Sequence, residues 1–137
     1  MPPDHTCWLD HCDRLALQAI ALGNPPVGSV IIRAGQLIAE GIEAGKTHQD
    51  ITYHAEIEAI RAAVRILGHT ALADCQLYTS HEPCIMCAYV IRHHRIREVI
   101  IRHRVPHIGG VTSAYPILTA TDIPIWGTPP GIVFEKT

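Results

Sequence analysis

Residues 80–96 read SHEPCIMCAYVIRHHRI, with two cysteines three positions apart directly after a proline. The pattern changes here from strand-like to helix-like, and Pro83 suits the first turn of a helix because its φ is already near the helical value. A spacing of three places the thiols of Cys84 and Cys87 on one helical face. The partial positive charge of a helix N-terminus favours thiolates over thiols. The stretch therefore predicts a pair of thiolates at the start of a helix, which alone would fit a redox pair or part of a zinc site.

A second helix start lies some thirty positions upstream, where residues 53–60 read YHAEIEAI. Residues 54–67 repeat apolar side chains at helical spacing, and Gly68 follows directly, as is typical of a helix end. His54 and Glu56 therefore stand at the beginning of this predicted helix.

The periodicity of the chain up to residue 104 predicts an alternation of strands and helices. The elements are a helix at 8–22, a hairpin of strands at 27–32 and 37–42, the helix at 54–67, strands at 75–80 and 98–101, and a helix at 85–94. This order implies an α/β fold in which a parallel set of strands is wrapped by crossover helices. Beyond Arg104, five prolines leave room for a turn of helix at 115–120 and an edge strand at 123–126 or 131–134.

The composition indicates one soluble globular domain spanning residues 1–137. Of its residues, 47% are hydrophobic and 18% are charged, and no apolar run approaches the ~18 residues that a membrane span needs. The N-terminus lacks the basic region and apolar core of a signal peptide, so we expect a cytoplasmic protein with reduced thiols. Cys7, Cys12 and Cys75 are then expected to be packing residues.

In an α/β layer, the loops that lead from neighbouring strands into helices emerge at the same edge of the sheet. We therefore expect His54, which starts one helix, to lie within reach of Cys84 and Cys87, which start the next. One imidazole and two thiolates are typical zinc ligands, and a set of three leaves the fourth position to water, as in catalytic sites. The sequence predicts a catalytic Zn²⁺ held by these three side chains.

Glu56 is two residues from His54, which makes it an inconvenient fourth ligand. At a helix entrance its carboxylate can face the water at the metal, take a proton from it and deliver that proton elsewhere. The alternative is a solvated acid whose negative charge interacts favourably with the dipole of its helix. In the company of three zinc ligands, we predict that Glu56 is the catalytic proton shuttle.

Residues 54–56 (HAE) and 83–87 (PCIMC) match the H-x-E and P-C-x-x-C signature of zinc-dependent deaminases. The chain resembles the cytidine and deoxycytidylate deaminase superfamily, in the branch of tRNA adenosine deaminases, guanine deaminases and fungal-type cytosine deaminases. The likeness covers about residues 8–110 and includes NPPVGSVII (24–32), HAEIEAIRAA (54–63), LYTSHEPCIMCA (77–88) and RIREVII (95–101).

This resemblance implies a three-layer α-β-α, cytidine deaminase-like fold with a central mixed sheet of about five strands flanked by helices. It implies one zinc ion and a homodimer or larger assembly. It also implies a reaction in which zinc-activated water attacks an amino-bearing ring carbon while Glu56 relays the proton to the ring nitrogen and to the departing ammonia. The backbone amides of Ala55 and Cys84 would help to hold the reacting group.

Two departures from the family pattern bear on the substrate. Many relatives have Gly-x-Asn at the end of the second strand, with the asparagine on the substrate, whereas this chain has Glu43, whose carboxylate only accepts hydrogen bonds. The proline-rich segment, about 106–137, lacks the long terminal helix of the tRNA enzymes, and we expect it to shape the pocket wall. His81, in the loop that enters the site, is either a substrate contact or a loop histidine without a role.

Arginines gather between residues 92 and 104, with histidines between them, in a chain whose formal net charge is −2. The arginines of this basic zone are Arg92, Arg95, Arg97, Arg102 and Arg104. They could bind RNA phosphates, as in an editing enzyme that acts on a single-stranded loop. They could instead solvate a helix or bridge a subunit interface, which we favour because no aromatic residues interleave the arginines to stack bases.

We predict an enzyme, a zinc-dependent deaminase that converts an amino-substituted nucleobase, nucleoside or related small heterocycle to the carbonyl form with release of ammonia. One alternative is a tRNA adenosine-to-inosine editing deaminase. Another is a non-catalytic binding module in which zinc only stabilises the fold. Glu56 argues against the module, since a structural zinc needs no proton shuttle. We expect a homo-oligomer with no membrane partner.

Overall fold

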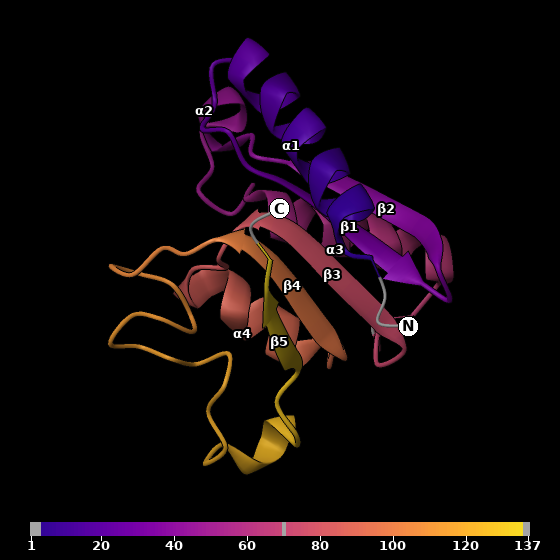
Figure 1. The fold of residues 1–137 in the computed structure, drawn as a ribbon, viewed down its shortest axis with the longest axis vertical. Coiled ribbons are helices and arrows are strands. Elements are labelled where there is room, and N and C mark those ends of the chain that lie inside the picture. Colours follow the sequence, from indigo (N-terminus) through magenta and orange to yellow (C-terminus); the bar gives the residue numbers. More distant parts are fainter. Residues whose placement is uncertain (1–3, 70, 136–137) are drawn as a thin grey trace.

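The computed structural model describes residues 4–69 and 71–135, so residues 1–3, 70 and 136–137 of the predicted domain lie outside the described part. A five-stranded sheet in the order β2-β1-β3-β4-β5 occupies the centre (Figure 1). Its strands are β1 (Gly28–Arg33), β2 (Gln36–Ile42), β3 (Cys75–His81), β4 (Glu98–His103) and β5 (Gly131–Phe134). The predicted strands are therefore all present in the sheet.

The sheet is mixed. Strand β1 pairs antiparallel with both β2 and β3, whereas β3, β4 and β5 run parallel to one another. The expected parallel set consists of β3, β4 and β5, and β1 and β2 form the expected hairpin. The five strands and the mixed directions agree with the fold that the family resemblance implied.

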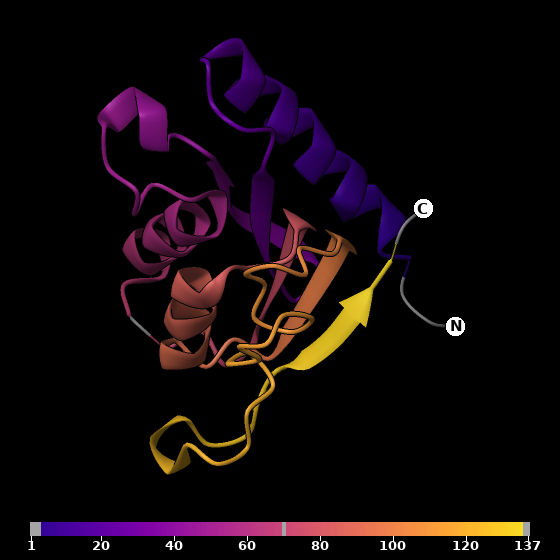
Figure 2. The same cartoon turned by 90° about the vertical axis from the view of Figure 1, so that its left-hand side faces the viewer.

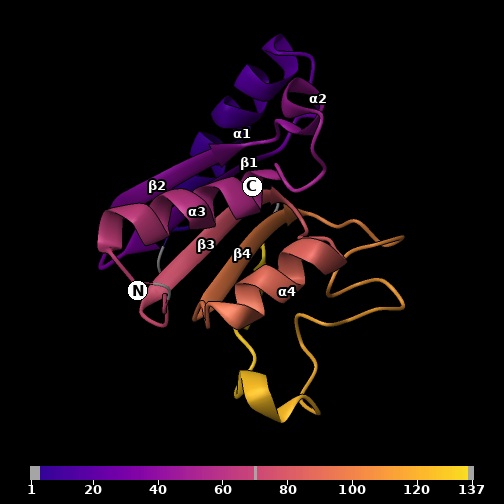
Figure 3. The same ribbon diagram turned by 180° about the vertical axis from the view of Figure 1, so that it is seen from behind.

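Helices cover both faces of the sheet, which gives three layers (Figures 2 and 3). Helix α1 (Thr6–Ala21) packs on one face, and helices α3 (Ala55–Leu67) and α4 (Ile85–His93) pack side by side on the other. A short helix, α2 (Gly45–His48), links β2 to α3 and was not predicted, because a single turn has no apolar periodicity. Among the described residues, none of the helices combines the length and hydropathy that a membrane span requires.

Two hydrophobic clusters fill the spaces between the layers. Ile31, Leu77 and Ile101 point toward α3 and α4, while their strand neighbours Val30, Tyr78 and Ile100 belong to the cluster under α1. Alternate side chains of a strand lie on opposite faces of a sheet, so strands that are covered on both faces are apolar throughout. Of the cysteines expected to pack, Cys12 and Cys75 are buried, but Cys7 is exposed on the outer side of α1.

The proline-rich end contributes one strand and otherwise irregular structure. Residues 131–134 form β5, residues 124–126 form a turn of 3₁₀ helix rather than a strand, and residues 115–120 contain turns without a helix. Strand β5 pairs in parallel with β4 along its whole length. Strand β5 therefore attaches the C-terminal part of the proline-rich segment to the sheet.

Arginines of the basic zone hold the chain together internally. Arg92, which is 2% exposed, donates to the carbonyl oxygens of Ile117 at 2.8 Å and Ala120 at 2.9 Å. Arg95 donates to the carbonyl oxygen of Ile125 at 2.7 Å. Buried guanidinium groups need such acceptors because an unpaired buried charge is costly. Arg92 and Arg95 therefore have a structural role inside one chain, which neither prediction for the basic zone included.

Arg102 shows the same behaviour on the other face of the sheet. It is 7% exposed on β4 and donates to Asp10 at 3.0 Å and Asp13 at 2.5 Å, both on α1. These ion pairs fix the start of α1 against the sheet. The carboxylates explain how this positive side chain is accommodated under a helix.

Candidate active site

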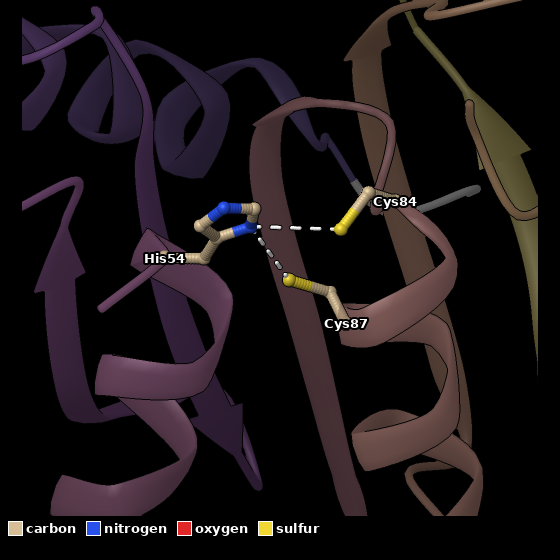
Figure 4. Close-up of side chains that lie close together, drawn as sticks. All are labelled: His54, Cys84 and Cys87. Carbon is tan, nitrogen blue, oxygen red and sulfur yellow. Dashed lines mark hydrogen bonds between the residues drawn. The ribbon is translucent and has the colours of Figure 1, made fainter. Parts of the chain in front are cut away.

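The N-termini of α3 and α4 meet at one edge of the sheet (Figure 4). His54 and Cys84 each occupy the residue before a helix, in extended backbone conformations with ψ of 150° and 178°. The Nδ1 atom of His54 lies 3.5 Å from the Sγ atom of Cys84 and 3.4 Å from that of Cys87. These ligand atoms all lie within 4.8 Å of one another. The structure thus brings the three predicted residues together.

The spacing of these atoms fits a tetrahedral zinc ion. Zinc bonds of about 2.3 Å to sulfur and about 2.05 Å to nitrogen at a tetrahedral angle require N···S distances of about 3.6 Å. The observed distances from His54 to the two sulfurs are 3.4 and 3.5 Å. Among the described residues, no fourth histidine, cysteine or carboxylate belongs to this group. The donor set therefore suits a catalytic zinc rather than a closed structural one.

The two thiols have opposite electrostatic character. A hydrogen bond from the Cys87 thiol lowers the pKa of Cys84 to about 4, and the contact with His54 acts in the same direction. That same bond to Cys84, together with burial, raises the pKa of Cys87 well above its usual value. The interaction with Cys84 also raises the pKa of His54 to about 9. The cluster thus holds a thiolate and attracts positive charge, as a cation site must.

Glu56 lies in the first turn of α3, beside the cluster, and is only 4% exposed. Burial raises the pKa of its carboxyl group to about 7, because the charged form loses hydration. A carboxyl group with a pKa near the working pH can both accept and return a proton. Burial therefore gives Glu56 the property that the predicted shuttle needs.

A small cavity of about 170 Å³ opens onto the cluster. Its lining residues are Val27, Glu43, His54, Glu56, His81, Glu82, Cys84 and Val105. Two of the predicted substrate contacts, Glu43 and His81, thus face the cavity. The third, Ala55, is completely buried and is absent from the lining of the described residues, so that only its backbone is a candidate for the predicted contact.

The first turn of α3 is held close to the sheet at Gly41 of β2. A Cβ atom at this glycine would lie 2.1 Å from the carbonyl oxygen of Ala55 and 2.6 Å from the amide nitrogen of Ala59. No larger residue fits between the strand and the helix without a backbone shift. Gly41, the glycine of the Gly-x-Asn pattern, therefore allows the close packing that positions His54 and Glu56, and this role does not depend on the residue at position 43.

His81 ends β3 at the rim of the cavity. Its Nδ1 atom lies 3.1 Å from the hydroxyl oxygen of Ser80, and its ring lies 5.1 Å from that of His103 on the neighbouring strand. Burial and the nearby His103 lower the pKa of His81. At neutral pH the cavity therefore presents a neutral imidazole here, beside the acidic Glu43 and Glu56.

Glu82 is the residue that sequence reasoning missed. Its buried carboxylate accepts hydrogen bonds from the backbone amides of Val105 at 2.9 Å, Val111 at 2.9 Å and Thr112 at 2.7 Å. The hydroxyl of Thr112 donates to it as well. Glu82 thereby ties the segment after β4 to the loop that carries Cys84, and Val105 in that segment lines the cavity. The only sequence signal was an acid directly before Pro83.

We expect Glu82→Ala to lower the free energy of unfolding by about 3 kcal/mol, because several buried amides lose their acceptor at once. Urea unfolding of the purified variant measures this loss. Glu40→Ala removes an exposed carboxylate on β2 that pairs with His11, and it serves as the control with an expected change of about 1 kcal/mol or less. Equal stability of the two variants would contradict the anchoring role of Glu82.

Comparison with known proteins places the chain in a family. The family model for the cytidine and deoxycytidylate deaminase zinc-binding region matches residues 3–103. A tRNA-specific adenosine deaminase of Aquifex aeolicus is 39% identical over 105 residues, which are 77% of this chain and 70% of the relative. A guanine deaminase of Bacillus subtilis is 45% identical over 85 residues, 61% of this chain and about half (54%) of the relative.

Solved structures give the same answer. A structure from studies of A-to-I editing by tRNA:A34 deaminases has a TM-score of 0.87 and 30% identity, covering 94% of this chain and 91% of that one. The Bacillus subtilis guanine deaminase structure has a TM-score of 0.71 and 40% identity, and the match covers 74% of this chain and 66% of that one. The predicted fold, zinc cofactor and enzyme class are thereby confirmed. The chain belongs to the cytidine and deoxycytidylate deaminase family of zinc-dependent hydrolytic deaminases.

Proposed function

We propose that this deaminase acts on a free amino-substituted nucleobase, nucleoside or related small heterocycle, replacing the amino group by a carbonyl oxygen and releasing ammonia. The observation that carries the proposal is the buried Glu56 beside His54, Cys84 and a cavity of about 170 Å³. A structural zinc staple would need neither the cavity nor a buried acid, so the non-catalytic module is disfavoured.

The metal roles follow from the donor atoms. His54 would bind zinc through Nδ1, and Cys84 and Cys87 would bind it through their sulfurs. Zinc held in this way supplies the acidification of water that makes a nucleophile available at neutral pH. The helix starts keep the two cysteines in place, because their backbone is fixed by α4.

Glu56 would move the proton. Its carboxylate would take one proton from the attacking water, place it on the ring nitrogen next to the reacting carbon, and then help to transfer a proton to the leaving amine. Water adds at the carbon, the bond from carbon to the amino nitrogen breaks, and ammonia leaves. The backbone amides of Ala55 and Cys84, at the helix starts, would donate hydrogen bonds to the reacting group.

The size and charge of the site support a small substrate. The cavity holds about 170 Å³, and its lining includes the carboxyl groups of Glu43 and Glu56. Arg92 and Arg102, from the basic zone, are engaged with carbonyl and carboxylate oxygens of the same chain. A formal net charge of −2 adds no general attraction to RNA phosphates.

A tRNA adenosine deaminase is the second candidate. It is favoured by the similarity to the Aquifex aeolicus protein and by the superposition on the structure from tRNA:A34 deaminase studies. Both candidates use the same zinc site and the same proton shuttle. They differ in whether a folded RNA must reach the cavity.

Ammonia release separates the two candidates. The zinc-loaded protein is incubated with guanine, cytosine, adenine, their nucleosides and related azaheterocycles, and in parallel with a tRNA that has adenosine in its anticodon loop. Release from a free compound, with weak tRNA binding at physiological salt, supports our proposal. Tight tRNA binding with a steep salt dependence, together with inosine formation and no release from free compounds, would overturn it.

The same proposal includes a homodimer or larger assembly of single-domain chains in the cytoplasm, with the proline-rich segment as part of the pocket wall. A groove of about 390 Å³ between α3 and α4 supports the assembly, because four apolar side chains line it together with two arginines and a histidine: Ile57, Ile60, Val64, Val90, Arg61, Arg65 and His94. Val111 and Thr112 of this segment donate hydrogen bonds to Glu82, a residue of the cavity lining, and this contact supports a role of the segment at the wall. Sedimentation of the purified chain measures the assembly, and a monomer at micromolar concentration would contradict it.

A further inference from the structure

Glu43 lies behind His54, on the side of the ring that faces away from the cysteines. Its backbone is fixed at the end of β2, where the Glu43 amide donates to the carbonyl oxygen of Val27 at 3.0 Å. The next amide, that of Ala44, donates to the carbonyl oxygen of Tyr53 at 2.9 Å, directly before His54. These bonds hold the glutamate beside the start of α3, where it is 9% exposed.

The two carboxylate oxygens of Glu43 have different neighbours. Oε2 accepts a hydrogen bond from the amide of Gly45 at 3.0 Å, which limits the rotation of the side chain. Oε1 lies 4.0 Å from Nε2 of His54. The other ring nitrogen of His54, Nδ1, points to the sulfurs (Figure 4). The imidazole is therefore placed between a pair of thiols and a carboxylate.

A neutral imidazole that binds a metal through one nitrogen carries its hydrogen on the other. A carboxylate that accepts this N–H fixes both the tautomer and the orientation of the ring, and it increases the basicity of the ligand. The gap of 4.0 Å between Oε1 and Nε2 needs a shift of about 1 Å to reach hydrogen-bond distance. The proposed contact therefore requires the end of the Glu43 side chain to rotate while Oε2 keeps the hydrogen bond from Gly45.

We propose that Glu43 is a positioning residue, which accepts the Nε2–H of His54 and so tightens the binding of zinc at Nδ1. The inference rests on the proposed function only in taking His54 as a zinc ligand. The same carboxylate lines the cavity, so the competing role is a direct contact with substrate. The two roles differ in one respect, since only the positioning role changes zinc affinity when no substrate is present.

Glu43→Gln is the decisive variant. The carbonyl oxygen of glutamine can still accept from Gly45, while its amide group turns a donor toward the Nε2–H donor of His54. We expect zinc to bind 10–100-fold more weakly, as is typical when the partner of a ligand histidine is lost. The dissociation constant is measured by competition with a chromogenic chelator in the absence of substrate. Glu40→Gln is the control, with an expected change below twofold, because this carboxylate on β2 is exposed and pairs with His11 rather than with His54.

A second measurement follows the hydrogen bond itself. In zinc-loaded protein labelled with ¹⁵N-histidine, the Nε2–H proton of His54 should give a downfield, slowly exchanging resonance, and Glu43→Gln should shift it upfield and speed its exchange. Glu43→Asp, which keeps the charge on a shorter side chain, serves if the glutamine variant fails to fold, and its zinc affinity should fall between those of the wild type and Glu43→Ala.

Zinc affinity within twofold of the wild type in Glu43→Gln, with an unchanged His54 resonance, would overturn the inference and leave Glu43 as a substrate contact. An equal loss in Glu40→Gln would also overturn it, because the effect would then be general. Neither measurement requires turnover. Failure of the proposed substrate class therefore appears in the ammonia assay alone, and failure of the positioning role appears in the zinc and resonance data alone.

Discussion

Glu56→Gln is expected to lose about 10²–10⁴-fold in turnover while still binding one zinc ion, because general acid–base catalysis contributes that much and the amide cannot carry the proton. The side chain is buried beside the cluster, so an isosteric amide preserves its packing. Glu56→Ala should show the same loss of turnover. The measurements are the rate of ammonia release on the substrate found in the panel, and the zinc content of the purified protein.

Glu58→Gln is the matched control for this prediction. It lies in the same first turn of α3, where its carboxylate pairs with Arg61 and takes no part in the cavity lining. Its turnover should stay within about threefold of the wild type, since a surface ion pair contributes ~1 kcal/mol or less. A Glu56→Gln variant that keeps a tenth of the wild-type rate would show that another group moves the proton.

Cys84→Ala is expected to abolish stable zinc binding and, with it, the stabilisation that zinc gives to the fold. A ligand present at about 1,000 times its dissociation constant stabilises the folded state by about 4 kcal/mol, and this contribution disappears with the site. Thermal unfolding with and without a chelator measures it. The wild-type Tm should fall on chelation, whereas the Tm of Cys84→Ala should be low and indifferent to chelator.

Cys7→Ala is the control for loss of a thiol, because Cys7 is exposed on α1 and distant in sequence from the site. It should keep the zinc content and the chelator response of the wild type. His54→Ala should behave like Cys84→Ala, since its Nδ1 atom is the third donor of the cluster. Full zinc occupancy in either site variant would refute the ligand set.

Much of the site was predictable because its signals are local. Cys84 and Cys87 are placed on one helical face by a spacing of three, and Pro83 and the change of periodicity locate the start of that helix. The pattern at residues 54–67 locates the other helix start in the same way. The sequence predicted that the two starts meet at one edge of the sheet, and they do so because β2 and β3, each antiparallel to the β1 strand between them, run in the same direction.

Other features depend on contacts between distant segments, which no local pattern encodes. Glu82 read as an ordinary loop acid, and only the packing of residues 105–112 against it revealed a buried anchor. The arginines of the basic zone read as a charged surface, yet Arg92 reaches carbonyl oxygens 25 and 28 positions along the chain. Charge and polarity are visible in a sequence, whereas the partner that satisfies a buried charge is chosen by tertiary packing.

The sequence by itself predicted the three candidate zinc ligands and the acid beside them, because covalent spacing and helical geometry fix those positions within one or two turns. Tertiary structure decided the direction of β1, the pairing of β5 and the environment of Glu43. Strand pairing and burial depend on residues tens of positions apart, and a carboxylate becomes a substrate contact or a partner of His54 only through what lies within a few ångströms of it.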